Sequence, residues 1–134
     1  MSAIPIVIEI LKKNPNVVAL AGPEVHAITA PQGTPLPNAV VSLLSEAENY
    51  TMTEGAMNYP DARVSVVCRA LAAGDAIRLG DAVIAALKNV DGLVTVAGAA
   101  RRVTVMRDQM DSTDYTDDGK VYRRMIGFRL RYRS

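Results

Sequence analysis

Cys68 and His26 are the only cysteine and the only histidine in the chain, and they are the residue types that a thiol nucleophile and its general base require. Cys68 lies on the apolar side of a predicted strand, where burial raises a thiol pKa and makes the thiol unreactive. Nothing in the sequence brings His26 near it, and one cysteine with one histidine forms no closed set of metal ligands. We therefore predict no catalysis and no metal site, and a small hydrolase using this pair is the least favoured of three hypotheses.

Four aspartates could bind a cation. Asp111, Asp114, Asp117 and Asp118 lie in a segment that ends Asp-Asp-Gly. A calcium loop needs ligands at positions 1, 3 and 5, glycine at 6 and glutamate at 12, and this segment lacks that pattern. The glycines elsewhere in the chain are isolated and form no phosphate-binding fingerprint. We predict a solvated acidic loop over Asp111–Gly119 and no cofactor.

Arginines recur along one side of the last predicted strand, at Arg129, Arg131 and Arg133, with Arg123 earlier in the same register. From residue 101 to the end there are nine basic and five acidic residues, an excess that can indicate an anionic partner. The aromatic side chains on which nucleic-acid bases stack are missing from this side. Ion pairing with an acidic neighbour, in this or another copy of the chain, is therefore the favoured interpretation. A small nucleic-acid-binding module, with affinity that falls steeply as salt rises, is the alternative.

The chain has 134 residues, which suits one domain spanning residues 1–134. A lone cysteine allows no internal disulfide and favours a reducing compartment. The first residues lack the basic segment of a signal peptide, and no apolar run approaches the roughly 20 residues that span a bilayer. These features predict an intracellular, soluble protein without a membrane partner.

A pair of helices is predicted at the N-terminus. Apolar residues recur at helical spacing in the first eleven residues, and the first helix ends at Asn14. Asn14 caps a second helix over residues 16–20, Pro15 occupies its first position, and Gly22 ends it. The two helices are expected to cover a sheet.

A proline-rich segment, residues 30–37, separates the first two predicted strands, Glu24–Thr29 and Ala39–Tyr50. Each proline fixes φ and holds the preceding residue extended, so the segment delivers the second strand at a fixed angle. The apolar run Val40–Leu44 predicts burial of that end of the strand. Thr51–Asn58 has no periodicity and is predicted to be an exposed loop.

The third strand, Asp61–Ala70, alternates apolar and polar residues. A helix over Ala76–Lys88 follows, capped by Asp75, with an apolar stripe formed by Ile77, Gly80, Val83, Ile84 and Leu87. The remaining predicted strands are Leu93–Ala97, Arg101–Gln109 and Lys120–Arg133. This order predicts an α+β fold: a mostly antiparallel sheet of about five to six strands, with an N-terminal helical pair and one amphipathic helix packed on it.

In this order, the segments resemble the small tail-completion, or tail terminator, proteins of long-tailed bacteriophages, a family also found in prophages and gene transfer agents. After the helical N-terminus, the resemblance is carried by three segments: Ala30-Pro31-Gln32-Gly33-Thr34-Pro35-Leu36-Pro37 running into Val40-Val41-Ser42, then Arg63-Val64-Ser65-Val66-Val67-Cys68 before the amphipathic helix, and Phe128-Arg129-Leu130-Arg131-Tyr132. It covers nearly all 134 residues. Asn38 departs from the family pattern, which commonly has an aromatic residue there, and Ala99–Asp118 matches only loosely.

The resemblance implies a structural virion protein that catalyses nothing and forms a ring, commonly a hexamer. The ring would terminate the tail tube and join the tail to the head connector. The implied partners are copies of this chain, the tail tube protein and a head-completion or connector protein, with DNA at most passing through the ring lumen. The implied location is the tail–head junction of the virion, after assembly in the bacterial host cytoplasm. A neighbouring head–tail connector ring protein is a second alternative.

Two sets of charged residues are expected at the subunit or tail-tube interface, because a ring joins one patch to a different patch on the next copy. They are the basic residues of the last strand and the acidic residues of the two polar loops: Arg123, Arg129, Arg131, Arg133, Glu54, Asp114, Asp117 and Asp118. We also expect both loops to be mobile in the free protein and to order on assembly, since neither has enough apolar surface to offset its ordering entropy.

Overall fold

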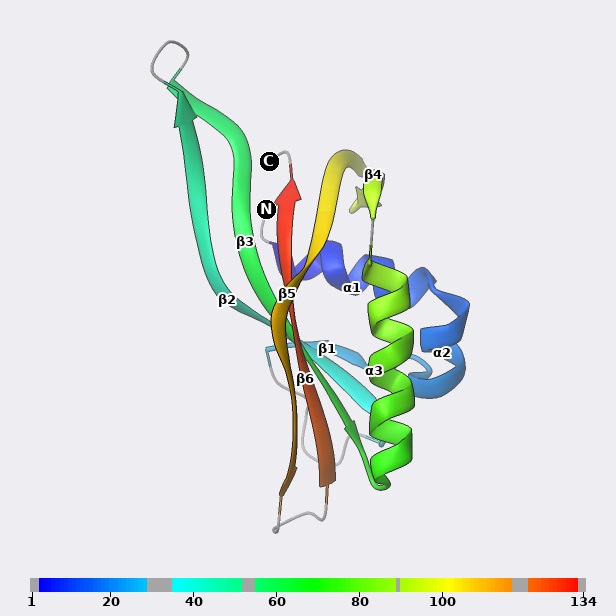
Figure 1. The fold of residues 1–134 in the computed structure, drawn as a ribbon. Helices are drawn as coiled ribbons and strands as arrows, with labels where there is room; N and C mark the ends of the chain where they lie inside the picture. The colour runs from blue at the N-terminus through cyan, green and yellow to red at the C-terminus, as the bar shows by residue number, and fades with distance from the viewer. Residues whose placement is uncertain (1–2, 29–34, 52–54, 89, 117–120, 133–134) are drawn as a thin grey trace.

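The computed structural model describes residues 3–28, 35–51, 55–88, 90–116 and 121–132, and Figure 1 shows how its elements are arranged. Two helices, α1 (Ala3–Lys13) and α2 (Pro15–Ala21), form the predicted N-terminal pair. The Asn14 side chain caps α2, because its Oδ1 accepts hydrogen bonds from the backbone N–H groups of Asn16, at 3.0 Å, and Val17, at 3.2 Å. Gly22, at φ 60°, ends α2 as predicted.

Six strands form one sheet in the spatial order β1-β2-β3-β6-β5-β4. Their bounds are Val25–Ala27 (β1), Asn38–Thr51 (β2), Gly55–Ala70 (β3), Asp91–Val96 (β4), Ala99–Thr116 (β5) and Val121–Tyr132 (β6). Only the β1–β2 pair is parallel, and every other neighbouring pair is antiparallel. The helix α3 (Ala73–Leu87) connects β3 to β4. The predicted α+β fold with a mostly antiparallel sheet is confirmed.

The helices gather on one face of the sheet, and the core lies between them and that face (Figure 1). The predicted alternation on β3 and β6 places the core residues correctly. Val64, Val66 and Cys68 are fully buried on β3, and Ile126 and Phe128 are fully buried on the neighbouring β6. Successive strand residues point to opposite faces, so the other face of these strands carries the polar residues. We call it the open face, because no described helix covers it.

The helix α3 begins earlier and is rotated relative to its prediction. It starts at Ala73, and its N-cap is Ala72 rather than Asp75, which lies in the first turn and accepts a hydrogen bond from Arg78. Its buried residues are Ala76, Leu79, Gly80, Val83 and Leu87. Ile77, predicted to be buried, is 46% exposed, because α3 contacts the sheet and α2 through the adjacent stripe.

Strand pairing extends into both predicted loops, so these two predictions are wrong over the described residues. Thr51 pairs with Gly55, and β5 continues through Asp111 to Thr116, which pairs with Val121. Pairing satisfies the backbone groups of these polar segments, which periodicity alone does not predict. The remaining parts of the two predicted loops lie outside the described residues.

The described burial of β2 ends at Val41, since Leu43 and Leu44 are exposed, and this corrects the predicted buried run to Leu44. The helices cover only the first part of this long strand (Figure 1). Asn38 at the start of β2 is fully buried, and its Nδ2 donates to the carbonyl oxygen of Pro35 at 3.2 Å.

A tight hairpin joins β4 and β5. Ala97, at φ 52°, and Gly98, at φ 81°, form a two-residue turn whose twist matches that of the flanking strands. Asp91 begins β4, two residues before the predicted start. None of the helices in the described ranges is long and apolar enough to cross a membrane.

Candidate interaction surface

A series of ion pairs crosses the open face of the sheet. Arg63 on β3 donates from Nε to Asp108 of β5 at 3.0 Å, reaching across β6. Arg129 on β6 donates from Nη2 to Asp61 of β3 at 2.8 Å. Arg131 Nε lies 4.0 Å from the same Asp61 carboxylate. Each of these cations therefore faces a carboxylate on another strand of the sheet.

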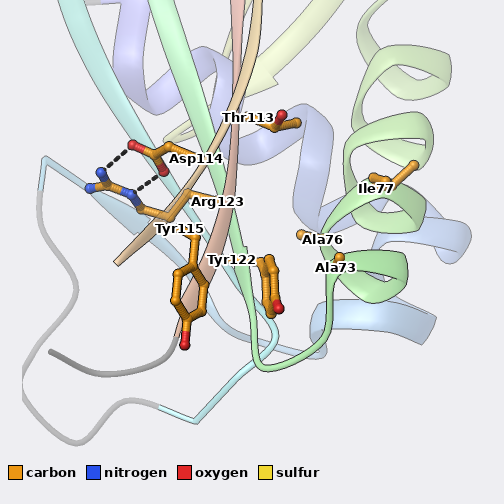
Figure 2. Close-up of a pocket in the computed structure, with 8 residues that line it drawn as sticks. All are labelled: Ala73, Ala76, Ile77, Thr113, Asp114, Tyr115, Tyr122 and Arg123. Carbon is orange, nitrogen blue, oxygen red and sulfur yellow. Dashed lines mark hydrogen bonds and ion pairs between the residues drawn. The ribbon is translucent and has the colours of Figure 1, made fainter. Parts of the chain in front are cut away.

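Arg123 and Asp114 form a two-pronged pair near the end of the β5–β6 hairpin (Figure 2). Arg123 Nε donates to Asp114 Oδ1 at 2.7 Å, and Nη2 donates to Oδ2. Hydrogen bonding from Arg123 lowers the pKa of the Asp114 carboxyl, and the same bonds raise the pKa of Arg123. Both groups stay charged near neutral pH, so this pair is suited to ion pairing and not to proton transfer.

The structure places four of the eight sequence-predicted site residues in ion pairs within the chain: Arg123 pairs with Asp114, and Arg129 and Arg131 pair with Asp61. The prediction of ion pairing for the arginine face is confirmed for Arg123, Arg129 and Arg131. This pairing neutralises much of the face and weakens the case for phosphate binding. The other four predicted interface residues, Glu54, Asp117, Asp118 and Arg133, lie outside the described residues.

A bulge in β5 explains how Asp108 reaches Arg63. The register between β5 and β6 shifts between Arg107 and Asp111. The bulged residues cover Gly127 of β6: a Cβ added at Gly127 would lie 3.1 Å from Met110 Cβ and 3.2 Å from Asp108 Cβ. A side chain at residue 127 would therefore push against the bulged residues of β5. Residue spacing alone carries no signal for this bulge.

Arg124 was missed by the sequence analysis, although it forms ion pairs with carboxylates on two different elements. It points to the helix face, where it donates to both oxygens of Asp111, at 3.0 and 2.9 Å, and to Asp81 of α3 at 2.8 Å. Nη1 also donates to the carbonyl oxygen of Ile77 at 3.1 Å. Its side chain is only 12% exposed. Strand alternation could have revealed it, because Arg124 lies on the same side of β6 as the buried apolar residues Ile126 and Phe128.

This network fixes the charges of its members. Hydrogen bonding from Arg124 is the main reason that the pKa of the Asp111 carboxyl is lowered, with Arg107 contributing. The same contacts raise the pKa of Arg124. The network thus joins α3 to β5 and β6 through permanent charges.

A pocket of about 340 Å³ lies between the start of α3 and the end of the β5–β6 hairpin. Tyr115 and Tyr122 pair across the two strands with ring centroids 4.7 Å apart, and Figure 2 shows both rings beside the start of α3. Ala73, Ala76 and Ile77 form the opposite wall. The carboxylate in the lining, Asp114, is held by Arg123, and the rest of the lining is mainly apolar and aromatic, so the pocket is suited to apolar contact.

The structure separates the cysteine from the histidine. Val25, Ala39 and Cys68 share one row of the sheet on the core face, whereas His26 pairs with Val40 and lies on the opposite face. Burial raises the pKa of Cys68 to about 12, as the sequence predicted in direction. His26 Nε2 lies 2.7 Å from a Glu24 oxygen. Among the described residues, no three His, Cys, Asp or Glu side chains come together as a metal site.

Comparison with known proteins identifies a family for this chain. The model of the family described as "Tail completion protein gp17" matches residues 6–133. The chain belongs to this family. It is therefore a tail-completion protein, a structural component of a phage tail.

One similar solved structure is described as "Virion of native gene transfer agent (GTA) particle". A chain in it aligns with a TM-score of 0.66 and 23% sequence identity, and the alignment covers 98% of this chain and 94% of that chain. This likeness shows a shared fold over nearly the full length of both chains. The search of curated proteins finds no match.

Proposed function

We propose that this tail-completion protein forms a ring, expected to be a hexamer, that terminates the tail tube and joins the tail to the head connector. The match of the family model over residues 6–133 is the observation that carries the proposal. The proposed partners are other copies of the chain, the tail tube protein and a head-completion or connector protein. The protein assembles in the bacterial host cytoplasm and lies at the tail–head junction of the virion, where DNA passes through the lumen.

The shape of the sheet supports a ring. A ring needs two different complementary patches on each copy. This sheet has two unlike ends, with the long strand β2 beside the three-residue β1 at one end and the short strand β4 at the other. A paired sheet with different ends can join head to tail without any catalytic feature.

The charged open face supplies the proposed contact with a partner. Arg129 and Arg131 are each about half exposed while sharing the Asp61 carboxylate. One carboxylate does not satisfy two guanidinium groups, so donors remain available for acidic groups on a neighbouring protein. The Arg123–Asp114 pair extends the same face toward the β5–β6 hairpin.

The proposal is tested by native mass spectrometry over a concentration series, combined with negative-stain images of the protein mixed with isolated tail tubes. We expect closed rings of six copies and rings at tube ends. A strict monomer at every concentration, with bare tube ends in the mixture, would contradict the proposal. Rings that bind connectors and leave tubes uncapped would instead indicate the neighbouring connector role.

A further inference from the structure

Beyond Leu43, the hairpin formed by β2 and β3 projects past the helices (Figure 1). We call residues 44–51 of β2 with residues 55–63 of β3 the arm. Its strands pair out to Thr51 and Gly55. The arm is paired only within itself over its outer length, so its stability there does not come from the core.

The outer edge of the arm is open within the described residues. On that side β1 pairs with Ala39–Val41 of β2, and the last described backbone bond is from the Ile28 N–H to the Val41 carbonyl. The rest of β2 continues to Thr51 and presents every second N–H and C=O outward. Such an edge is a template for pairing with another strand.

The arm has a distinctive charge. From residue 14 to residue 62 the sequence contains no lysine or arginine, and the strands of the arm contain the acidic residues Glu46, Glu48 and Asp61. Asp61 is paired with Arg129, and the other two have no cation near them in the sequence. The arm is therefore an acidic strand pair that favours a basic partner surface.

A groove lies at the other end of the sheet, with Lys13 from the basic last turn of α1 in its lining. It has a volume of about 410 Å³ and lies between the outer edge of β4 and the junction of α1 with α2, with Ile10, Val90, Leu93 and Val94 in its lining. Leu93 is 74% exposed and adds apolar surface at this edge. We call this the β4 groove.

Four cations lie on the segments beside the β4 groove: Lys12 and Lys13 in the last turn of α1, Lys88 after α3, and Arg102, which pairs with Leu93 of β4. Glu9 and Asp91 are the acidic residues of α1 and β4. The pairs Lys13–Glu9, at 3.0 Å, and Arg102–Asp91, at 3.6 Å, are solvent-exposed and weak enough to exchange partners. Lys12 and Lys88 have no acidic partner in the part of the chain that the structure describes. The groove thus combines an open strand edge, apolar surface and unpaired positive charge.

We infer that the arm of one copy docks in the β4 groove of a second copy, with the outer edge of β2 adding to β4. Arm and groove lie on opposite edges of one sheet, separated by β3, β6 and β5, so they join different copies. The contact is head-to-tail and closes when the rotation per copy divides a circle. This inference rests on the proposed ring and identifies which two patches form it.

Charge exchange tests the contact. Two variants are made: Glu46→Lys/Glu48→Lys in the arm and Lys12→Glu/Lys13→Glu at the groove. Each raises the protein concentration needed for half-assembly at least tenfold, because each places like charges together. A chain carrying all four substitutions recovers assembly, because the surfaces are complementary again. The control Arg78→Glu changes an exposed cation on α3 outside the groove and leaves assembly unchanged.

Cross-linking provides a measurement that does not depend on charge. Ser45→Cys on the exposed part of β2 combined with Leu93→Cys gives a ladder of covalent oligomers with a short bis-maleimide cross-linker. Leu71→Cys with Leu93→Cys is the matched control and gives none. Cys68 contributes no background, because it is buried.

The outcomes separate the two proposals. Wild-type rings that persist in both reversed-charge variants, together with no cross-linked ladder, overturn the docking of the arm and leave the ring intact. Absence of wild-type rings, alone and on tail tubes, overturns the proposed function itself. Loss of assembly in both variants with recovery in the fourfold variant supports the docking.

Discussion

Arg124 connects α3 to β5 and β6 through ion pairs. It contacts carboxylates on two elements and a backbone carbonyl on the helix, in a position that is nearly closed to solvent. A charge in such a place is stable only when all of its partners are present. The arrangement therefore makes this part of the fold sensitive to single substitutions.

Replacing Arg124 with alanine should lower the free energy of unfolding by about 2 kcal/mol, because it removes the ion pairs to Asp81 and Asp111 and leaves Asp111 only the more exposed Arg107 as a partner. Urea unfolding followed by circular dichroism measures the change. Arg102→Ala is the control, since Arg102 is 62% exposed and 3.6 Å from Asp91, and we expect a change within roughly 0.5 kcal/mol. Equal losses in the two variants would contradict this role of Arg124.

The same network gives a pH dependence. The pKa of Asp111 is lower in the folded chain than in the unfolded chain, so its contribution is present above the unfolded value of about 3.9 and is lost as pH falls through the folded value. Wild-type stability should therefore fall more steeply than that of Arg124→Ala between about pH 5 and pH 3. Urea unfolding at three pH values in this window tests it, and parallel curves would refute it.

Gly80 is where Arg124 passes closest to α3. A Cβ at this position would lie 2.6 Å from Arg124 Cδ, whose side chain is fixed by its ion pairs. Gly80→Ala should cost about 1–3 kcal/mol by overpacking, against a gain of about 1 kcal/mol in helix propensity. In the Arg124→Ala background the sign should reverse. Gly74→Ala, with its nearest atom at 3.7 Å, is the control and should be neutral or stabilising.

At the scale of elements, alternation and capping were predictable where one face of a segment is buried. The sequence alone predicts the cap of α2 at Asn14, its end at Gly22, and the alternating buried residues of β3 and β6, because these features follow local rules. The extensions of β2, β3 and β5 into the predicted loops were not predictable, because their pairing depends on a partner strand rather than on a buried face. The β5 bulge and the rotation of α3 were not predictable either, because contacts with other elements determine both.

The β5 bulge can be tested at Gly127. Gly127→Ala should lower the free energy of unfolding by about 1–3 kcal/mol, because the new methyl group meets Met110 Cβ and Asp108 Cβ, which the backbone holds in place. Thermal unfolding measures the loss. Gly92→Ala on β4 has no atom within 4 Å of its added Cβ and should show almost none. A harmless Gly127→Ala would mean that the bulge moves freely away from β6.

At the scale of the whole molecule, only part of the predicted interface could be placed from the sequence. Those on β6 could be placed from strand alternation, and their partners Asp61 and Asp114 follow from register. The open edges of β2 and β4 could not be predicted, since an edge is defined by the absence of a neighbour in the sheet. The resemblance to tail-completion proteins was visible in the order of segments, and the family match confirms it.

A chain that ends at residue 120 should fail to form the native sheet, because β6 supplies the partners of both β3 and β5. Far-UV circular dichroism and urea unfolding should show no cooperative transition. A chain shortened instead by its first two residues keeps every described element and should unfold cooperatively, like the full chain. Cooperative unfolding of the shorter chain without β6 would refute the central role of this strand.

The position of β6 also governs the order of events during synthesis. It leaves the ribosome after every other described element, yet it lies between β3 and β5 in the sheet. Until it arrives, β1–β2–β3 and β4–β5 remain two separate groups whose apolar faces cannot close into one core. Non-local pairing of this kind slows folding and delays it toward the end of translation. A nascent chain is thus kept from completing its sheet until almost all of the described residues have been synthesised.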